Sequence, residues 1–163
     1  MLLRRFLVAV AALAAAAPAS AHGPGHAMSG GRPGDPAKAT RTIEIVATDN
    51  AFSLKSLQVR DGETIRFVVR NDGFDSHELL IGTRHEHAEH IEMMRAMIEA
   101  EKKGQHSHDM AGMEEQHASG VTVAPGKTRS FVWTFARTAD LEFACDIPGH
   151  YKDGMHGPIS FDR

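Results

Sequence analysis

The sequence is notable first for what it lacks. It contains one cysteine among 163 residues, so an internal disulfide bond is excluded. There is no basic excess, because 18 Lys and Arg residues against 21 Asp and Glu residues give a formal net charge of −3, which argues against a nucleic-acid partner. After residue 17 no apolar run is long enough to span a bilayer. Histidine and methionine, by contrast, are abundant, with 11 and 8 residues.

Residues 1–21 have the pattern of a secretory signal peptide. Arg4 and Arg5 precede an apolar run over residues 6–17, and the segment ends in the small-residue sequence Pro18-Ala19-Ser20-Ala21. The alternative, an uncleaved membrane anchor, is disfavoured because the apolar run is too short. Cleavage after Ala21 would leave 163 − 21 = 142 residues with a formal charge of −3 − 2 = −5. We therefore expect an exported, periplasmic protein of one domain. A lone thiol in that oxidising compartment needs protection, which metal ligation can provide.

The remaining chain divides into an arm and a strand-rich domain. Residues 22–41 are rich in His, Gly and Pro and are predicted to be a flexible arm, and residues 42–163 form the domain. Short alternating apolar segments separated by Gly, Pro and Asp turns predict strands. Their expected ranges are 42–47, 54–60, 64–70, 76–81, 121–123, 128–135, 141–145 and 157–162. This pattern predicts an all-β fold, a small sandwich or barrel.

A segment rich in His, Met and Glu, residues 84–119, interrupts the strands. Its first part, residues 86–103, predicts a helix with His87, Ile91, Met94 and Ile98 on one stripe. Apolar residues at this spacing usually belong to a core, so we expect the stripe to pack against the strands. The second part, residues 104–119, is polar and is predicted to be a loop.

The segment between the last two predicted strands carries the most specific motif. Cys145, His150 and Met155 follow one another in the spacing C-x4-H-x4-M, and His77 opens an upstream strand. Two imidazoles and a thiolate in a trigonal plane, with a weak axial thioether, are the ligand set of a blue-copper centre. Zinc is the main rival metal, but a thioether is a poor zinc ligand. The sequence therefore predicts a copper site at His77, Cys145, His150 and Met155.

At these residues the chain resembles the cupredoxins, the plastocyanin/azurin-type blue-copper family. The resemblance covers residues 41–163, apart from the inserted segment, and the C-x4-H-x4-M loop is similar to the rusticyanin and auracyanin branches. It implies a Greek-key β-sandwich with a helical and loop insertion, and a type 1 copper with His77, Cys145 and His150 equatorial and Met155 axial. The His/Met-rich insertion resembles that of periplasmic copper-tolerance cupredoxins.

Two positions near the motif bear on the chemistry of the site. Many family members have Asn or Ser after the first His ligand, whereas this chain has Glu78, so the hydrogen bonds around the copper are expected to differ. His156 follows Met155 directly. Because four ligands already complete the site, His156 is interpreted as a surface residue.

Further histidines and methionines leave two interpretations open. Imidazole and thioether groups bind copper, but such residues also occur on solvated helices and in loops. In the insertion they are His85, His87, His90, His106, His108, His117, Met93, Met94, Met97, Met110 and Met113. Cleavage would also place His22 at the N-terminus, near His26 and Met28, where it either binds additional copper or belongs to a disordered arm.

The function that the sequence favours is a periplasmic type 1 copper-binding protein in copper tolerance or homeostasis, with redox cycling of the bound copper. The alternative is a single-electron carrier between periplasmic redox partner proteins. An enzyme is disfavoured, because copper enzymes of this kind need further copper sites and 142 residues leave no room for a second domain. A two-copper electron-transfer centre is excluded by the single cysteine. The expected partners are a copper ion and a redox partner protein.

Overall fold

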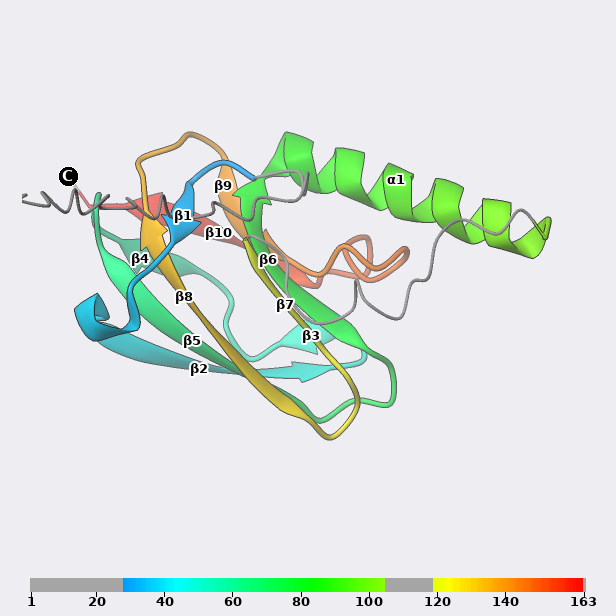
Figure 1. Ribbon diagram of the computed structural model, residues 1–163, viewed down its shortest axis with the longest axis horizontal. Helices are drawn as coiled ribbons and strands as arrows, with labels where there is room; N and C mark the ends of the chain where they lie inside the picture. Colours follow the sequence, from blue (N-terminus) through cyan, green and yellow to red (C-terminus); the bar gives the residue numbers. More distant parts are fainter. Residues whose placement is uncertain (1–27, 105–118, 163) are drawn as a thin grey trace, which may run out of the picture.

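The computed structural model describes residues 28–104 and 119–162, which form two facing β-sheets and one long helix (Figure 1). Each sheet has five strands. The order in the first sheet is β1 (Gly31–Pro33), β8 (Thr128–Phe135), β5 (Thr64–Asn71), β2 (Arg41–Thr48) and β3 (Ala51–Phe52). The order in the second is β4 (Leu57–Val59), β10 (His156–Phe161), β9 (Leu141–Ala144), β6 (His77–Thr83) and β7 (Gly120–Val123).

The connectivity is that of a Greek-key sandwich rather than a simple meander. β2 pairs in parallel with β5, and β4 pairs in parallel with β10, while the other strand pairs are antiparallel. Parallel neighbours require the chain to cross between the sheets before it returns. The prediction of an all-β sandwich is therefore confirmed, and the predicted strand 128–135 coincides with β8.

The core lies between the two sheets. The alternating residues Ile65, Phe67 and Val69 of β5 are buried, as the period of two predicts. They pack in one cluster with Trp133 on β8 and Phe143 on β9. Burial of these large side chains on both inner faces fixes the register of the strands, because a slip of one residue would expose the whole set.

The prediction of a flexible arm over residues 22–41 is wrong for its second half. Arg32 in β1 pairs with Thr134, and a short 3-10 helix, η1 (Pro36–Lys38), follows with Asp35 as its N-cap. Gly31 has a φ of +149°, and a side chain there would collide with the carbonyl of Thr134. The second half of the arm is thus an edge strand itself, held to β8 by backbone pairing that leaves no apolar period in the sequence.

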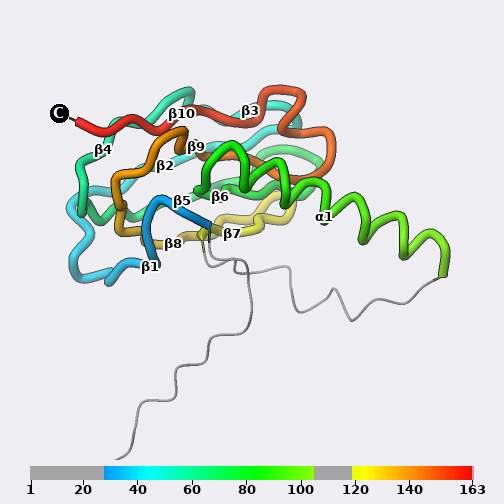
Figure 2. Tube along the Cα trace, turned by 90° about the horizontal axis from the view of Figure 1, so that it is seen from above, coloured from blue at the N-terminus to red at the C-terminus, as the bar shows by residue number. Residues whose placement is uncertain are grey.

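The helix of the insertion, α1, spans Arg84–Lys102 and begins with a capping box. The Thr83 side chain accepts a hydrogen bond from the Glu86 amide, and the Glu86 carboxylate accepts one from the Thr83 amide. The predicted apolar stripe packs only at its start. His87 and Ile91 are buried, but Met94 and Ile98 are half-buried because the helix projects beyond the sandwich (Figures 1 and 2).

The loop predicted for residues 104–119 lies mostly outside the described residues, which resume at residue 119. Within the described parts of the chain, no helix combines the length and the apolar character needed to cross a membrane.

Candidate metal centre

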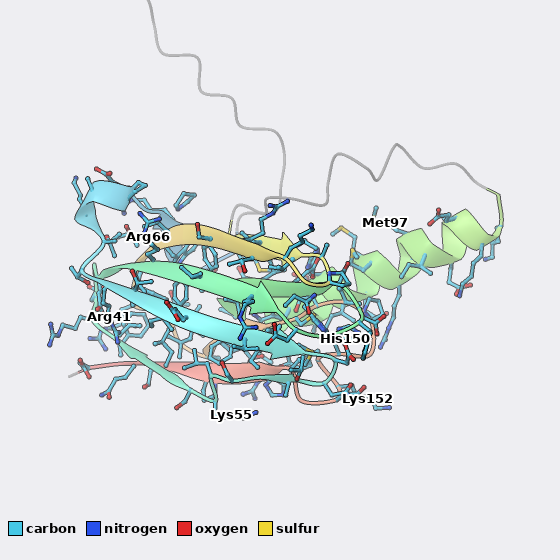
Figure 3. All side chains as sticks on the ribbon, turned by 90° about the horizontal axis from the view of Figure 1, so that it is seen from below. Arg41, Lys55, Arg66, Met97, His150 and Lys152 are labelled. Carbon is cyan, nitrogen blue, oxygen red and sulfur yellow. The ribbon has the colours of Figure 1, made fainter. Side chains whose placement is uncertain are left out.

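The four predicted ligands come from strand ends at one end of the sandwich. His77 is the first residue of β6, Cys145 follows the last residue of β9, and Met155 precedes β10. His150 lies in the loop between β9 and β10. Figure 3 shows it at the end from which α1 projects, opposite Arg41. Since β6 and β9 are paired neighbours, His77 and Cys145 meet although 68 residues separate them in the sequence.

Three of these residues bring their donor atoms together. The ligand atoms of His77, Cys145 and His150 all lie within 4.8 Å of one another. The Nδ1 atoms of the two histidines are 3.2 Å apart, and Cys145 Sγ lies 3.4 Å from His150 Nδ1. The fourth residue, Met155, is fully buried in the same core cluster as Cys145. Its role as the axial ligand remains a prediction.

The loop that holds three of the predicted ligands is closed by its own backbone. The Cys145 amide donates to the carbonyl of Met155, and the Met155 amide donates to the carbonyl of His150, both at 3.0 Å. Gly149 and Gly154 have φ values of +109° and +101°, which non-glycine residues adopt only with strain. The short loop therefore reverses the direction of the chain. It places the side chains of Cys145, His150 and Met155 at one end of the sandwich.

Burial sets the protonation of the candidate ligands. Burial, and to a smaller extent the neighbouring His150, lowers the pKa of His77 and so favours the neutral ring that binds metals. Burial also raises the pKa of the Cys145 thiol to about 12. A metal that binds here must therefore displace the thiol proton.

Cys145 Sγ is surrounded by polar groups of the backbone. The Glu78 amide donates a hydrogen bond to it over 3.3 Å. The nearby backbone amide of Ile147 also favours the thiolate and so lowers the pKa of Cys145 against the effect of burial. The side chain of Glu78 is buried next to the candidate ligand His77. The contact to sulfur comes from the backbone, so it is retained whatever the side chain at position 78.

The sequence did not assign a role to Asp146, which lies next to Cys145 and is fully buried. His87 and His90 of α1 both contact its carboxylate, with Nδ1 to oxygen distances of 2.9 and 3.0 Å. These contacts lower the pKa of Asp146 against the opposing effect of burial. The pKa of His87 is raised because the Asp146 carboxylate outweighs burial, and the pKa of His90 is raised mainly by its hydrogen bond to Asp146.

These contacts decide between the two interpretations left open for His87. Both of its ring nitrogens face protein oxygen atoms, since Nε2 lies 3.4 Å from the carbonyl of Glu142. It is a buried structural residue in this arrangement rather than an auxiliary copper ligand. Its place on the predicted stripe beside Ile91 was the sequence signal for burial. His85, one residue from Glu86, is exposed and lies 3.4 Å from Glu89.

The other candidate histidines and methionines are placed less centrally. His156 is partly exposed, as predicted, and stacks on Tyr151 with ring centroids 4.3 Å apart. Met28 is buried beside Gly82 rather than free in an arm, so the structure does not place it as an arm ligand. Met93, Met94 and Met97 are half-buried on α1. The other candidates lie outside the described residues: His22, His26, His106, His108, His117, Met110 and Met113.

The donor set fits copper. Metal–nitrogen bonds near 2 Å place neighbouring ligand atoms about 3–4 Å apart, which is the spacing found here. The Nε2 atom of His77 is buried with no hydrogen-bond partner among the described residues, 3.6 Å from Asp49 Oδ1. A soft thiolate beside two imidazoles is a site that suits copper in both oxidation states.

Fold and site together define the class of protein. The family model described as copper binding proteins of the plastocyanin/azurin family matches residues 39–162. The chain belongs to this family of copper-binding cupredoxins. Among its relatives, it is similar to the copper-resistant cuproprotein CopI of Pseudomonas aeruginosa, with 35% identity over 156 residues that cover 84% of each chain. It is also similar to CopI of Rubrivivax gelatinosus, with 39% identity over 145 residues covering 86% of this chain and 80% of the relative.

Solved structures support the fold alone. Auracyanin B superposes with a TM-score of 0.61 at 16% identity, over 83% of this chain and 97% of its own. Dithionite-reduced auracyanin from Roseiflexus castenholzii superposes with a TM-score of 0.57 at 23% identity, over 77% and 99%. These likenesses confirm the cupredoxin sandwich that the sequence predicted.

Proposed function

We propose that the chain is an exported, periplasmic type 1 copper protein that acts in copper tolerance and that its bound copper changes oxidation state in use. The observation that carries the proposal is the convergence of the ligand atoms of His77, Cys145 and His150, of which His77 and Cys145 are buried and His150 is half-buried. The role in tolerance is supported by relatives named copper-resistant cuproproteins, which match most of the chain. The leader-like residues 1–21 support export.

The proposed ligands are His77, Cys145 and His150 in one plane, with Met155 as the axial ligand. Bound copper supplies one-electron redox chemistry at this position. The protein contributes a closed loop that fixes three ligands and a buried sulfur that accepts a hydrogen bond from the Glu78 amide. A site restrained in this way changes little between oxidation states, which favours rapid electron transfer. We propose a binding and redox role rather than catalysis of a substrate reaction.

The test is a copper titration of the chain from residue 22, followed by optical and spin-resonance spectra. We expect one tightly bound copper with an intense thiolate-to-copper absorption, and none in Cys145→Ser. In a copper-sensitive bacterial strain, the wild-type gene should restore growth on copper and Cys145→Ser should not. A colourless wild-type protein whose thiol still reacts with an alkylating reagent after copper addition would refute the proposal.

A dedicated electron carrier is the second candidate function. It is favoured by one observation: within residues 28–104 and 119–162, His77, Cys145 and His150 are the one group of three His, Cys, Asp or Glu residues whose ligand atoms lie close enough to share a metal. A carrier binds one copper per chain, whereas a tolerance protein that buffers copper is expected to bind more. The two are separated by a variant in which the His and Met residues of segment 105–118 are replaced: His106, His108, Met110, Met113 and His117.

This variant is preferable to deletion of the whole insertion, 84–119. Helix α1 packs against the site through His87 and Ile91, so a full deletion would disturb the main copper centre as well. For a tolerance protein, the replacement should lower both the copper stoichiometry and resistance while the visible spectrum is unchanged. An unchanged stoichiometry and unchanged resistance would favour the carrier. Reoxidation of the reduced, copper-loaded protein by air is the separate check on redox cycling.

A further inference from the structure

A buried carboxylate lies between the proposed sulfur ligand and one of the amides that surround it. Asp146 follows Cys145 and precedes Ile147, and its side chain is fully inaccessible to solvent. His87 Nδ1 lies 2.9 Å from both carboxylate oxygens, and His90 Nδ1 lies 3.0 Å from Oδ2. Carboxylate oxygens only accept, so both histidines donate to Asp146.

Both donors come from one rigid element. His87 and His90 are three residues apart on α1 and therefore share a face of the helix. The start of α1 is fixed by the capping box at Thr83 and by the Ser29 amide, which donates to Glu86 Oε1 over 2.7 Å. Figure 2 shows the first turns of α1 beside the loop that leads into β10. The two histidines thus tie this loop to an element outside the sandwich.

Because Asp146 is adjacent to Cys145, its contacts with His87 and His90 affect the position of the sulfur. The residue before Asp146, Cys145, carries Sγ, and the residue after it, Ile147, carries a backbone amide close to Sγ. Fixing the side chain of Asp146 therefore restrains both peptide units at once. Partners of ligand residues that fix orientation typically affect metal affinity by about 10–100-fold.

We propose that His87 and His90 are positioning residues for the copper centre, which act through Asp146 to hold the adjacent Cys145 Sγ in its ligating position. The inference rests on the proposed function and deepens it, because it gives the first turns of the His/Met-rich insertion a role at the main site.

The first experiment compares three substitutions at matched positions. His87→Leu removes the donor, His87→Asn retains a donor near the Nδ1 position, and His85→Leu is the control on an exposed face of the same helix turn. We expect His87→Leu to lower copper affinity by about tenfold or more and to change the relative intensities of the sulfur-to-copper absorption bands. His87→Asn should recover much of both properties, and His85→Leu should match the wild type.

The second measurement needs no metal. In the folded, metal-free protein, the rate at which iodoacetamide alkylates Cys145 reports how often the sulfur loop opens. We expect His87→Leu to raise this rate about tenfold, the factor that corresponds to loss of one charge-assisted hydrogen bond. If His87→Leu does not fold, His90→Leu tests the same carboxylate from a partly exposed position, where the side chain is 13% accessible.

The route through Asp146 is tested by a double substitution. If His87 acts through Asp146, Asp146→Asn combined with His87→Leu should perturb affinity and spectrum no more than the larger single change. If the effects of Asp146→Asn and His87→Leu are additive, His87 does not act through Asp146. The proposal fails altogether if His87→Leu and His90→Leu lower only the thermal stability and leave spectrum, affinity and alkylation as in His85→Leu. A wild type that binds no copper would instead refute the proposed function.

Discussion

The backbone amide of Glu78 donates a hydrogen bond to the sulfur of Cys145 over 3.3 Å, across the paired strands β6 and β9. Glu78 follows the candidate ligand His77, so one peptide connects a ring ligand with the sulfur ligand. The geometry depends on the pairing of β6 with β9 and not on the nature of the side chain at position 78. This separation of backbone and side-chain roles can be tested directly.

Glu78→Asn should leave copper binding nearly unchanged, within about threefold, because the contact to Cys145 Sγ comes from the amide. Because hydrogen bonds and charge near the sulfur tune the centre, a small change in reduction potential is expected. Copper affinity measured by competition with a chelator checks the prediction. If Glu78→Asn strips the metal, the proposed ligand set is incomplete.

Cys145→Ser should abolish the intense visible absorption, because that colour requires charge transfer from a thiolate to copper. Copper binding itself should weaken strongly, since a hydroxyl is a harder and less acidic ligand than a thiol. Optical spectra at equal protein concentration, with total copper measured in parallel, check both statements. A coloured Cys145→Ser protein would show that copper binds at a different site.

Met155→Leu should retain copper and raise the reduction potential, because a weak axial ligand tunes the potential more than the affinity. Met155 is fully buried, and leucine has a similar volume, so the free energy of unfolding should change by less than about 1.5 kcal/mol. We expect a rise of about 59 mV or more, a tenfold change in the equilibrium constant of a one-electron couple. Redox titration followed at the visible band gives the value, and an unchanged potential would exclude Met155 as the axial ligand.

The sequence predicts well those features that depend on residues close together in the chain. The strand pattern of β5 and β8 and the three spaced residues of the C-x4-H-x4-M loop are each readable within about ten residues. Their side chains alternate or lie in one loop, so the pattern reflects the structure directly. The pairing of His77 with this loop was predicted from residue type and from the family resemblance, because spacing does not reveal a contact across 68 residues.

What the sequence misses depends on contacts between distant segments. β1 is held by backbone pairing to β8, which leaves no side-chain signature around Arg32. Asp146 is an ordinary loop residue by its type, and its burial depends on two histidines that lie more than 50 residues earlier. The distal part of the predicted stripe is wrong because periodicity shows that a helix is amphipathic but not how far its partner surface extends.

We expect the start of α1 to become less stable in acid, because the Glu86 carboxylate becomes protonated. Burial opposes ionisation of this carboxyl, but hydrogen bonds from Thr83 and Ser29 outweigh it and lower its pKa below the reference of 4.5. The stabilisation is therefore complete above the pKa of the unfolded chain and is lost as the pH falls through the lower pKa of the folded protein. Glu86→Gln should reduce the free energy of unfolding by about 1 kcal/mol at pH 7.

The difference between wild type and Glu86→Gln should then shrink towards zero below the folded pKa, because the wild-type carboxyl becomes protonated too. Urea unfolding of the metal-free protein between pH 7 and pH 3 measures this change. Glu89→Gln is the matched control, since its carboxylate lies on the same helix but is mostly exposed. It should show a small effect throughout. A difference for Glu86→Gln that stays constant down to pH 3 would mean that the negative charge is not what stabilises the helix start.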